Sequence, residues 1–572
     1  MHNIHISSHT ASLPAGHSRG FCPIGTWVES ETDKNSSPSL SAALMQVNRP
    51  VYLCRGPHAD YQVHTTGHAI LGEPDGAAKM STGSSYELLA YASPLPPHAC
   101  GDAAFLKTHN MRYPVIAGSM AKGISSVTMV KAMGEAGMLG FLGSAGLDAD
   151  TVETQLRQLQ RDLDPGGYAY GSNLIHSPNE PELEQELVDM YMRIGLKLIE
   201  ASAFLQITAP LVEYRLHGIH RDEDGHIVTP NMVIAKVSRE EIAAHFLSPA
   251  PEKIVKQLQA QGKISAEQAE LARHIPMAED ITAEADSGGH TDNRPAMALL
   301  PTIVALRDTL QQQYQYQNPP RVGLGGGIAT PYAAAGAFIL GAAYIVTGSV
   351  NQACVEAGTC DAVKQMLSEA QQADIAMAPA ADMFEMGVDV QVLKRGTMFS
   401  MRAASLYELY RNHSSIEDIP QAERTKLEKT IFKAGLDEVW ENTRNFFARR
   451  DPREIERADR DPKHKMALIF RSYLGQATHW AIDGDPQRRI DYQIWCGPAL
   501  PAFNAWTKGT FLHQPEQRKV VDINLNLLLG ASVWLRANML GQQRAFYERT
   551  HPDEALTLRP LTREQIDTCL QA

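Results

Sequence analysis

Between Tyr113 and Ser349 the sequence repeats one pattern, in which a short apolar run ends in a glycine, serine, asparagine or other polar residue and a helical stretch follows. Most of these runs are continuously apolar, which is typical of strands buried on both faces of a parallel sheet. The eight runs are Tyr113–Ser119, Met138–Ser144, Tyr168–His176, Leu196–Phe204, Met232–Ser238, Asp280–Ser287, Arg321–Ile328 and Ala343–Ser349. Eight strand–helix units predict an α/β fold of the (β/α)8 TIM-barrel type, whose functional side chains collect at the C-terminal ends of the strands.

An open, doubly wound sheet is the alternative arrangement, because ligands bind at strand ends there as well. The run GLGGGI at 323–328 looks like the dinucleotide fingerprint of such sheets, but the final glycine of G-x-G-x-x-G would fall at Ile328. No predicted strand opens with a proper dinucleotide fingerprint, so the pattern favours the barrel.

The residues before the barrel differ from it in composition. Residues 1–105 are rich in Ser, His, Pro and Gly and predict a tail followed by a small β-rich domain, with strand-like pieces at Pro50–Arg55 and Tyr86–Ser93. The barrel itself is expected over residues 106–370. Within it, the charged stretch Ser238–His274 predicts a helical insertion between the fifth and sixth strands.

The last third of the chain is predicted to be helical. Residues 371–517 are rich in aromatic side chains and arginine and indicate a helical substrate-binding lobe beside the barrel mouth. Residues 518–572 are predicted to form C-terminal helices that pack back on the barrel. The apolar stretch Val520–Leu540 is interrupted by charged and amide side chains. It therefore falls short of the roughly 20 apolar residues that a membrane-spanning helix needs.

Composition and charge narrow the classes of function. The chain has 572 residues, of which 44% are hydrophobic and 20% charged, as in soluble globular proteins of several domains. Its formal net charge of -13 argues against a nucleic-acid partner. The seven cysteines form no CxxC pair and no Cys/His spacing, so neither a disulfide framework nor a metal site is indicated. Since the N-terminus lacks the apolar region of a signal peptide, we expect a cytoplasmic protein without a membrane partner.

The segment Glu284–Asn293, which follows the sixth apolar run, has the features of a chemical site. It contains Gly288 and Gly289, and two adjacent glycines allow the backbone to approach a flat or bulky group. His290 comes directly after them and can offer a proton or a hydrogen bond to that group. His290 could also be an ordinary loop histidine, but its place at the end of a predicted strand favours a functional role.

Two glycine-bearing loops end the seventh and eighth strands. Exposed backbone N–H groups there can face an anion, and barrels often bind phosphate with these two loops. Tight turns would explain either loop alone, whereas the two together favour a phosphate site. The candidate residues are Gly325, Gly326, Gly327, Thr347, Gly348 and Ser349.

Small residues end the first and second strands and leave room for a planar ring across the barrel mouth. Asn173, at the end of the third strand, has an amide that can donate to and accept from a heterocycle, although a turn residue is the simpler interpretation of Asn173 alone. Together with the phosphate loops, these positions suggest a mononucleotide-like cofactor, and flavin mononucleotide (FMN) has the right shape. The candidate residues around the ring are Ala117, Gly118, Ser119, Met120, Asn173 and Gly289.

Lys236, near the end of the fifth strand, is a second candidate for catalysis and for flavin binding. It could face a flavin carbonyl or a substrate oxygen, and a plain ion pair is an equal alternative. Asp286, Asp292 and Arg294 are expected to orient His290 or to shape its loop.

Six long motifs in this chain resemble a known family. They are YPVIAGSMAKGI, EAGMLGFLGSAGL, DITAEADSGGHTDNRP, GLGGGIATPYAAAGAFILGAAYIVTGSVNQ, APAADMFEMGVDVQVLKRGTMFSMRA and IWCGPALPAFNAWTKGTF. In this order they resemble the PfaD-type trans-acting enoyl reductases of polyunsaturated fatty acid synthases and trans-acyltransferase polyketide synthases, over roughly residues 50–545. More distantly, the barrel is similar to nitronate monooxygenases and to flavin-dependent bacterial enoyl reductases.

The resemblance implies FMN in the barrel, NADPH as electron donor, and an enoyl thioester on an acyl carrier protein as substrate. His290 matches the histidine that follows the paired glycines in that superfamily, which implies that it places or relays a proton. A nitronate monooxygenase-type FMN oxidase and a flavin-bearing scaffold remain the alternatives. The oligomeric state is open, with a homodimer among the options. For the acidic carrier we expect a local basic patch on the lobe, with Arg488 and Arg489 as candidates.

Overall fold

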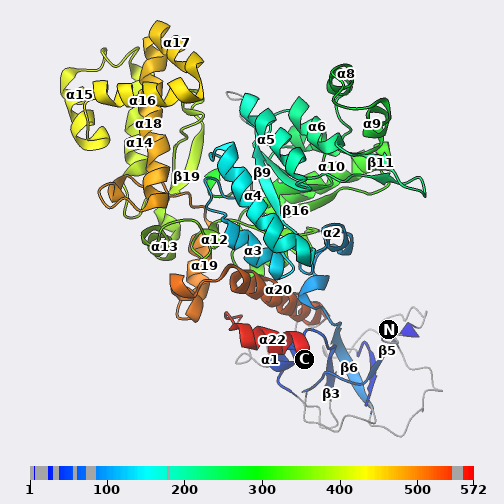
Figure 1. Cartoon of the computed structure of the whole chain (residues 1–572). Coiled ribbons are helices and arrows are strands. Elements are labelled where there is room, and N and C mark those ends of the chain that lie inside the picture. The colour runs from blue at the N-terminus through cyan, green and yellow to red at the C-terminus, as the bar shows by residue number, and fades with distance from the viewer. Residues whose placement is uncertain are drawn as a thin grey trace, which may run out of the picture. The chain divides into compact units, whose positions relative to one another are not determined.

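The computed structural model describes residues 5–6, 23–29, 38–55, 61–72, 85–176, 181–543 and 558–572. They divide into two compact units (Figure 1). The small unit comprises Met1–Gly101, Pro331–Gly336 and Asn524–Ala572, and the large unit comprises Asp102–Thr330 and Ala337–Ile523. Most of the tail predicted at the start of the chain lies outside the described residues.

The core of the large unit is a closed barrel of eight parallel strands in the order β10-β13-β14-β16-β17-β7-β8-β9. The strands are β7 (Val115–Ala117), β8 (Leu139–Leu142), β9 (Gly171–Ile175), β10 (Leu198–Ser202), β13 (Met232–Val237), β14 (Asp280–Glu284), β16 (Arg321–Gly325) and β17 (Ile345–Thr347). Each falls within one of the eight predicted apolar runs, and most of their residues are buried. The predicted (β/α)8 barrel is therefore confirmed.

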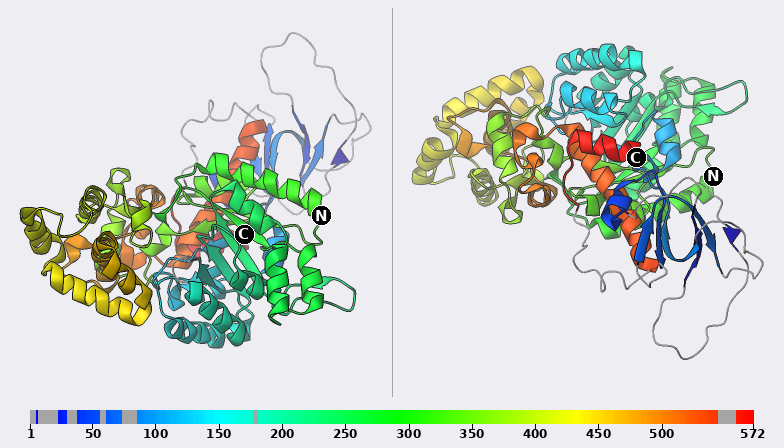
Figure 2. Two further views of the ribbon diagram at one scale, coloured as in Figure 1. Left: turned by 90° about the horizontal axis from the view of Figure 1, so that it is seen from above. Right: turned by 90° about the horizontal axis from the view of Figure 1, so that it is seen from below.

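Helices follow the strands and cover the outside of the barrel, where Figure 2 shows several of them in cyan and green. Ser126, Asp148 and Thr208 begin α3, α4 and α6 by accepting a hydrogen bond from a backbone N–H three residues on. The helices of the large unit in this part of the chain are α2 (Ala103–Thr108), which precedes β7, and then α3 (Val127–Glu135), α4 (Ala149–Leu163), α5 (Pro181–Ile194), α6 (Ala209–Leu216), α10 (Ala296–Tyr314), α12 (Ser349–Gln352) and α13 (Asp361–Ser368). The helix α11 (Pro331–Ile339) follows β16, and its residues Pro331–Gly336 group with the small unit. The predicted insertion between the fifth and sixth strands is also present, as α7 (Glu240–Leu247), α8 (Glu252–Ala260) and α9 (Ala266–Leu271).

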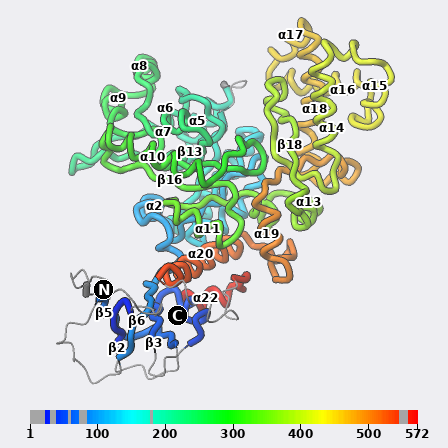
Figure 3. Tube along the Cα trace, turned by 180° about the vertical axis from the view of Figure 1, so that it is seen from behind, coloured from blue at the N-terminus to red at the C-terminus, as the bar shows by residue number. Residues whose placement is uncertain are grey.

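The lobe of the large unit contains a small sheet as well as helices, which corrects the expectation of a purely helical lobe. The antiparallel strands β18 (Ile375–Pro379) and β19 (Asp389–Leu393) pair along their length, and β15 (Gly289–His290) adds to β19. Figure 3 shows α14, α16 and α18 side by side beyond this sheet. The helices are α14 (Phe399–Asn412), α15 (Gln421–Leu427), a π-helix at Glu428–Phe432, α16 (Leu436–Arg450), α17 (Pro452–Arg460), α18 (Pro462–Asp483) and α19 (Ala499–Thr507).

The small unit contains a six-stranded sheet in the order β1-β5-β2-β6-β3-β4. The two strand-like pieces predicted at Pro50–Arg55 and Tyr86–Ser93 correspond to β3 and β6. Trp27, Tyr52 and Leu88 belong to its buried apolar cluster. The elements are β1 (His5–Ile6), β2 (Gly25–Val28), α1 (Leu40–Met45), β3 (Val51–Arg55), β4 (Tyr61–His64), β5 (His68–Leu71), β6 (Ser85–Ala92) and α22 (Arg563–Gln571).

The C-terminal helix α20 (Val520–Gln543) departs from two expectations. From Asn524 onward it groups with the small unit, whereas the C-terminal helices were expected to pack on the barrel. Within the described part of the chain, α20 alone is long and apolar enough by length and composition to cross a membrane, so the expectation that it falls short is wrong. Its apolar window is nevertheless 67% buried inside the structure, as in a helix of a protein core.

Arg536 explains why a charged residue interrupts this apolar helix. Its side chain is fully buried, and its guanidinium donates to the carbonyl oxygens of Leu44 at 2.6 Å, Gln46 at 3.1 Å and Ser93 at 3.2 Å, and to that of Arg49. Burial lowers the pKa of Arg536 to about 10. The arginine thus satisfies several carbonyl groups that would otherwise be buried without a donor.

Candidate active site

The loop after the sixth barrel strand brings His290 into the sheet of the lobe. Gly289 pairs with Gln391 and His290 with Val390, so that β15 extends the sheet beyond β19. Gly289 has a φ of +81°, in the left-handed region that glycine adopts most easily. The backbone of His290 is therefore fixed by strand pairing and is not that of an open loop.

Gly288 is needed for a close approach between this loop and the lobe. A Cβ at Gly288 would lie 2.8 Å from the backbone nitrogen of Gly497 and 2.9 Å from Ser349 Oγ. A Cβ at Gly497 would lie 2.5 Å from the backbone nitrogen of Gly288. Each distance is too short for a real side chain. A flat or bulky group was expected against the bare face of the glycine pair, but at Gly288 the lobe backbone occupies that face.

His290 forms a close polar pair with an aspartate of the lobe. Its Nε2 lies 3.0 Å from Oδ1 of Asp382, and 41% of the His290 side chain and 52% of the Asp382 side chain are exposed. Partial burial lowers the pKa of His290, but the hydrogen bond and charge of Asp382, together with the charge of Glu284, outweigh that effect and raise the pKa above its ordinary value. His290 therefore stays protonated to a higher pH than a free histidine.

Lys236 forms an ion pair at the mouth of the barrel. Its Nζ lies 2.9 Å from Oε1 of Glu284 on the neighbouring strand. Burial lowers the pKa of Lys236, but the charges of Glu284 and Glu200 outweigh it and raise the pKa above the ordinary range. Of the two roles left open for Lys236, the structure contains the ion pair. The protonated lysine places a positive charge beside the sixth strand.

Glu200 on β10 is an acidic group that the sequence analysis missed. Its Oε2 accepts hydrogen bonds from the backbone N–H of Ser119, at 3.0 Å, and from the Ser119 hydroxyl. Burial raises the pKa of Glu200, and this effect exceeds the opposing influence of Lys236 and Ser119. Its Oε1 is buried without a hydrogen-bond partner among the described residues. Buried polar atoms are nearly always satisfied, so Oε1 is a place where a bound polar group would find a partner.

The glycines after the seventh and eighth strands have different surroundings. A Cβ at Gly326 would lie 2.6 Å from the backbone of Ala285, so Gly326 permits close strand packing. A Cβ at Gly327 or Gly348 would have no atom within 4 Å among the described residues, so the backbone at both positions borders open space. Because bare backbone beside open space is what an anion needs, these two positions fit a phosphate best among the predicted loop residues.

The side chains of the other predicted loop residues are engaged within the protein. The Thr347 hydroxyl donates to the Ile116 carbonyl oxygen at 3.2 Å, and Ser349 Oγ accepts from the backbone N–H of Gly497 at 3.3 Å. Gly325 is closely packed, because a Cβ at this position would lie 3.2 Å from Thr282 Cγ2. These residues shape the two loops, so an anion bound there would meet backbone groups.

Four of the residues predicted around a planar ring, Ala117 to Met120, lie at the C-terminal end of β7 and directly after it. The backbone N–H of Met120 donates to Ser125 Oγ at 2.9 Å, and a Cβ at Gly118 would lie 2.8 Å from Val346 Cγ1 and 3.7 Å from Glu200 Oε1. Ala117 is buried within β7. The small residues after β7 thus border the unpartnered oxygen of Glu200.

Asn173 lies in the barrel wall, and its amide nitrogen is already engaged. It donates to the Glu200 carbonyl oxygen and to Ser202 Oγ, both at 3.0 Å, and only 3% of the residue is exposed. The amide therefore links β9 to β10. This contact favours the simpler, structural interpretation of Asn173 over a hydrogen bond from its nitrogen to a heterocycle.

The predicted orienting residues of His290 bind elsewhere. Asp286 accepts a hydrogen bond from Gln391 Nε2 at 2.8 Å. Asp292 accepts from Ser238 Oγ at 2.6 Å and from Arg239 Nε at 2.9 Å. The Arg294 carbonyl accepts from the backbone N–H of Asp286 at 3.0 Å. Of the two roles expected for these residues, they shape the loop. The residue that contacts the imidazole of His290 is Asp382.

Comparison with known proteins agrees with this barrel. Residues 103–438 match the family model described as nitronate monooxygenase. The chain belongs to the nitronate monooxygenase family. Residues 413–492, which include α15 to α18 of the lobe, also match the model described as the inserted helical domain of [acyl-carrier-protein] S-malonyltransferase.

Relatives of this nitronate monooxygenase family member include one solved structure with the same architecture. It is the enoyl reductase domain of MlnA from the macrolactin biosynthesis cluster of Bacillus amyloliquefaciens, which is 39% identical with a TM-score of 0.75 and covers 78% of this chain and 99% of that domain. The resemblance carried by the six motifs is thereby confirmed.

Two curated relatives are longer proteins. The chain is 45% identical over 508 residues to one of the subunits of the polyunsaturated fatty acid synthase of Thraustochytrium sp., a match that covers 88% of this chain. It is 43% identical over 459 residues to the polyketide biosynthesis protein PksE of Bacillus subtilis, a match that covers 80% of this chain. The chain spans only 33% of the first relative and 59% of the second.

Arg488, expected in a basic patch for a carrier protein, is instead an internal support of the lobe. Its guanidinium donates to the carbonyl oxygens of Ile431, at 2.7 Å, and Phe432, and lies 3.1 Å from Asp491 Oδ2. It also stacks 4.2 Å from the centroid of the Trp480 ring. Of these two arginines, Arg489 is the exposed one and could belong to a basic surface patch.

Charge reversal at these two neighbours is expected to give different results. Arg488→Glu removes donors from buried carbonyl groups and places an acid beside Asp491, so the lobe should lose about 2–3 kcal/mol of stability. Arg489→Glu should stay within about 0.5 kcal/mol, because the side chain is exposed. Thermal denaturation followed by tryptophan fluorescence, to which Trp480 contributes, measures both. Equal losses in the two variants would contradict the internal role of Arg488.

Proposed function

We propose that this chain is an enoyl reductase that reduces the 2,3-double bond of an enoyl thioester held on an acyl carrier protein, with FMN as cofactor and NADPH as electron donor. The observation that carries the proposal is the His290–Asp382 pair at the end of the sixth strand of a barrel-and-lobe chain that matches 99% of the MlnA enoyl reductase domain. The names of the curated relatives support a place in polyketide or polyunsaturated fatty acid biosynthesis.

The residues at the barrel mouth fit FMN. The unpartnered Oε1 of Glu200 and the small residues after β7 would border its ring, and the open backbone at Gly327 and Gly348 would face its phosphate. When bound, FMN supplies the hydride for the double bond, after it has itself been reduced by NADPH. The protein contributes binding, orientation and electrostatics.

His290 is the residue that would supply the proton. Its Nε2 is engaged by Asp382, which leaves Nδ1 as the ring nitrogen that can pass a proton to the α-carbon of the substrate. The raised pKa keeps that proton on the ring to a higher pH than in a free histidine. The positive charge of Lys236, in its ion pair with Glu284, would favour the negative charge that develops on the thioester oxygen.

The alternative within the family is the oxidation of small nitronates, which the matched family model names. The long lobe favours the enoyl reductase, because a small nitronate does not need a cap of this size. A flavin-bearing scaffold without activity is the third alternative.

An absorption spectrum followed by two activity assays tests the proposal. The purified protein is expected to be yellow, with flavin absorption, and to oxidise NADPH only when a crotonyl-carrier protein thioester is present. Oxygen consumption with a nitronate should be near background. Turnover of the nitronate without turnover of the thioester would establish the alternative, and a yellow protein inactive in both assays would indicate the scaffold. A colourless protein that binds no added FMN would contradict all three.

A further inference from the structure

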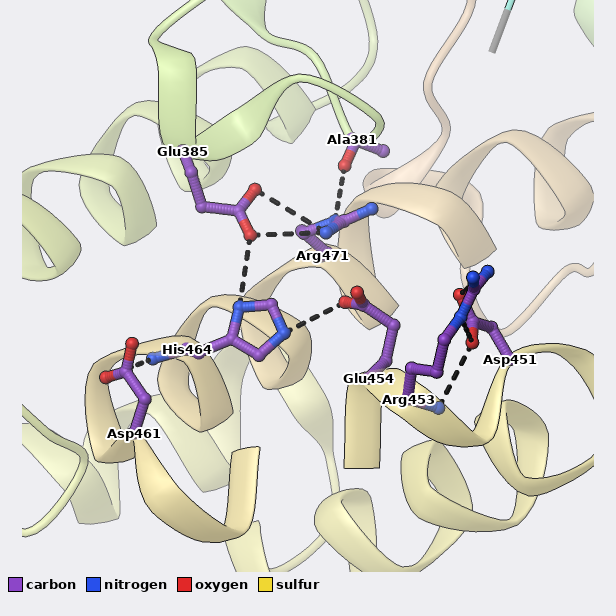
Figure 4. Close-up of polar contacts among 8 residues, drawn as sticks. All are labelled: Ala381, Glu385, Asp451, Arg453, Glu454, Asp461, His464 and Arg471. Atoms are coloured by element: carbon purple, nitrogen blue, oxygen red, sulfur yellow. Dashed lines mark hydrogen bonds and ion pairs between the residues drawn. The ribbon is translucent and has the colours of Figure 1, made fainter. Parts of the chain in front are cut away.

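Asp382 lies in a turn that a single arginine holds at two points. The turn follows β18 and leads into a short helix at Phe384–Met386. Arg471 of α18 donates from Nε to the Ala381 carbonyl oxygen at 2.9 Å, and its Nη1 lies 3.2 Å from Glu385 Oε1 (Figure 4). Asp382 stands between these two anchor points along the chain. The guanidinium therefore fixes the turn from which Asp382 reaches His290.

A second layer of polar groups lies beside Glu385. Its Oε1 lies 3.6 Å from Nδ1 of His464, whose Nε2 lies 2.9 Å from Glu454 Oε2 on α17. Figure 4 shows the imidazole ring standing between these two carboxylates, and only 1% of the His464 side chain is exposed. Asp461 caps α18 by accepting two backbone N–H groups at 3.0 and 3.2 Å, one of them that of His464. A row of buried or half-buried polar groups thus runs from α17 to the turn.

The charge of Arg471 also acts on Asp382. Partial burial raises the pKa of Asp382, but the hydrogen bond and charge of His290 outweigh it and lower the pKa, and Arg471 adds to this lowering. An ionised Asp382 is in turn what keeps the pKa of His290 raised. Loss of Arg471 would therefore affect His290 through both the position and the charge of Asp382.

We propose that Arg471 is a positioning residue for His290, which holds Asp382 in place through the Ala381 carbonyl and the Glu385 carboxylate. The inference rests on the proposed function for the proton role of His290, although Arg471 itself contacts neither His290 nor the reacting atoms. Lysine cannot replace it fully, because an ammonium lacks the planar fork that reaches two acceptors in fixed directions. Methionine would keep the apolar stem and lose both polar contacts.

The test titrates His290 by NMR in the full chain, with its imidazole signal assigned by its absence from His290→Gln. In Arg471→Met the pKa of His290 should fall toward the ordinary value, and kcat for the enoyl thioester should fall roughly tenfold to a hundredfold with little change in KM. Arg471→Lys should lie between Arg471→Met and the unaltered protein. Arg402→Lys is the matched control, because Arg402 is an arginine of the same lobe that pairs with the buried Asp491. It should leave the His290 titration unchanged.

Glu385→Gln is the second variant, since it keeps Arg471 and nearly the same shape at position 385. It should shift the His290 titration in the same direction by a smaller amount. An unchanged His290 titration in both Arg471→Met and Glu385→Gln, or an equal shift in Arg402→Lys, would overturn the inference. The titration needs no substrate, so it still tests the inference if the unaltered protein fails to reduce the thioester, a result that would count against the proposed function alone.

Discussion

Replacing His290 with alanine is expected to lower turnover of a crotonyl-carrier thioester by about 10² to 10⁴-fold, the usual contribution of a positioned general acid. The reason is geometric: Asp382 engages Nε2 at 3.0 Å and leaves Nδ1 to deliver the proton. NADPH oxidation at saturating thioester measures the effect. Flavin content, read from the visible spectrum, should stay unchanged, because the groups proposed to border the flavin at Glu200, Gly327 and Gly348 lie outside the loop of His290.

The matched control is His220→Ala. His220 is an exposed histidine in the hairpin β11 (His220–Arg221) and β12 (Ile227–Val228), which precedes the fifth barrel strand. It should turn over at the rate of the unaltered protein. If His290→Ala retains nearly full turnover while its flavin is intact, the proton comes from another group and the role of His290 is wrong.

Asp382 is expected to determine the pH at which the same reaction loses activity. The pKa of His290 is raised, so the protonated form persists above the ordinary value of about 6.5. Activity that needs this proton is present at lower pH and is lost as pH rises through the raised pKa. Asp382→Asn removes the stabilising charge, so this loss should begin at lower pH. A shift of the profile toward higher pH would contradict the pairing.

The barrel could be predicted from the sequence because its strands are buried on both faces. Such strands are continuous apolar runs, and runs such as Tyr113–Ser119 end in the small or polar residues that mark a strand end. The lobe sheet was missed for a different reason. β19 shows the alternation of a half-buried strand in Val388-Asp389-Val390-Gln391-Val392, a local signal that the aromatic and arginine-rich surroundings obscured.

The partner of His290 could not be found from local patterns. Asp382 is 92 residues away along the chain, and the backbone pairing that brings the loop to the lobe is the two-residue strand β15. A pairing this short has no periodicity to detect. Glu200, in contrast, did leave a signal, because an acid within the apolar run Leu196–Phe204 must be buried when that run forms a barrel strand.

Replacing Asp280 is expected to cost the barrel about 3–5 kcal/mol of stability, the usual loss when one member of a buried ion pair is removed. Asp280 begins β14, at the end of the barrel opposite the active site, and is fully buried. His109 Nε2 lies 2.6 Å from its Oδ2, and Arg321 Nε lies 2.6 Å from its Oδ1. Asp280→Asn would leave the Arg321 guanidinium without its counter-charge.

Urea denaturation and amide hydrogen exchange of the β14 and β16 peptides measure this loss. Exchange is the sharper measurement, because it reports on the barrel and not on the small unit or the lobe. Asp308→Asn is the matched control: Asp308 is 58% exposed and pairs with its neighbour Arg307, so its effect should stay within about 0.5 kcal/mol. Similar protection in Asp280→Asn and Asp308→Asn would contradict a stabilising role for the buried cluster.

The same aspartate predicts how the barrel responds to acid. Burial raises the pKa of Asp280, but the charge and hydrogen bond of His109, together with those of Arg321, outweigh it and lower the pKa. A carboxyl group whose pKa is lowered by folding stabilises the protein above its unfolded pKa of about 4, and this stabilisation is lost as pH falls through the folded value. Asp280→Asn should therefore flatten the acid side of the stability profile while leaving His290 and the active-site end of the barrel able to titrate as before. If stability below about pH 4 fell equally steeply in both proteins, the acid sensitivity of the barrel would have to come from other carboxylates.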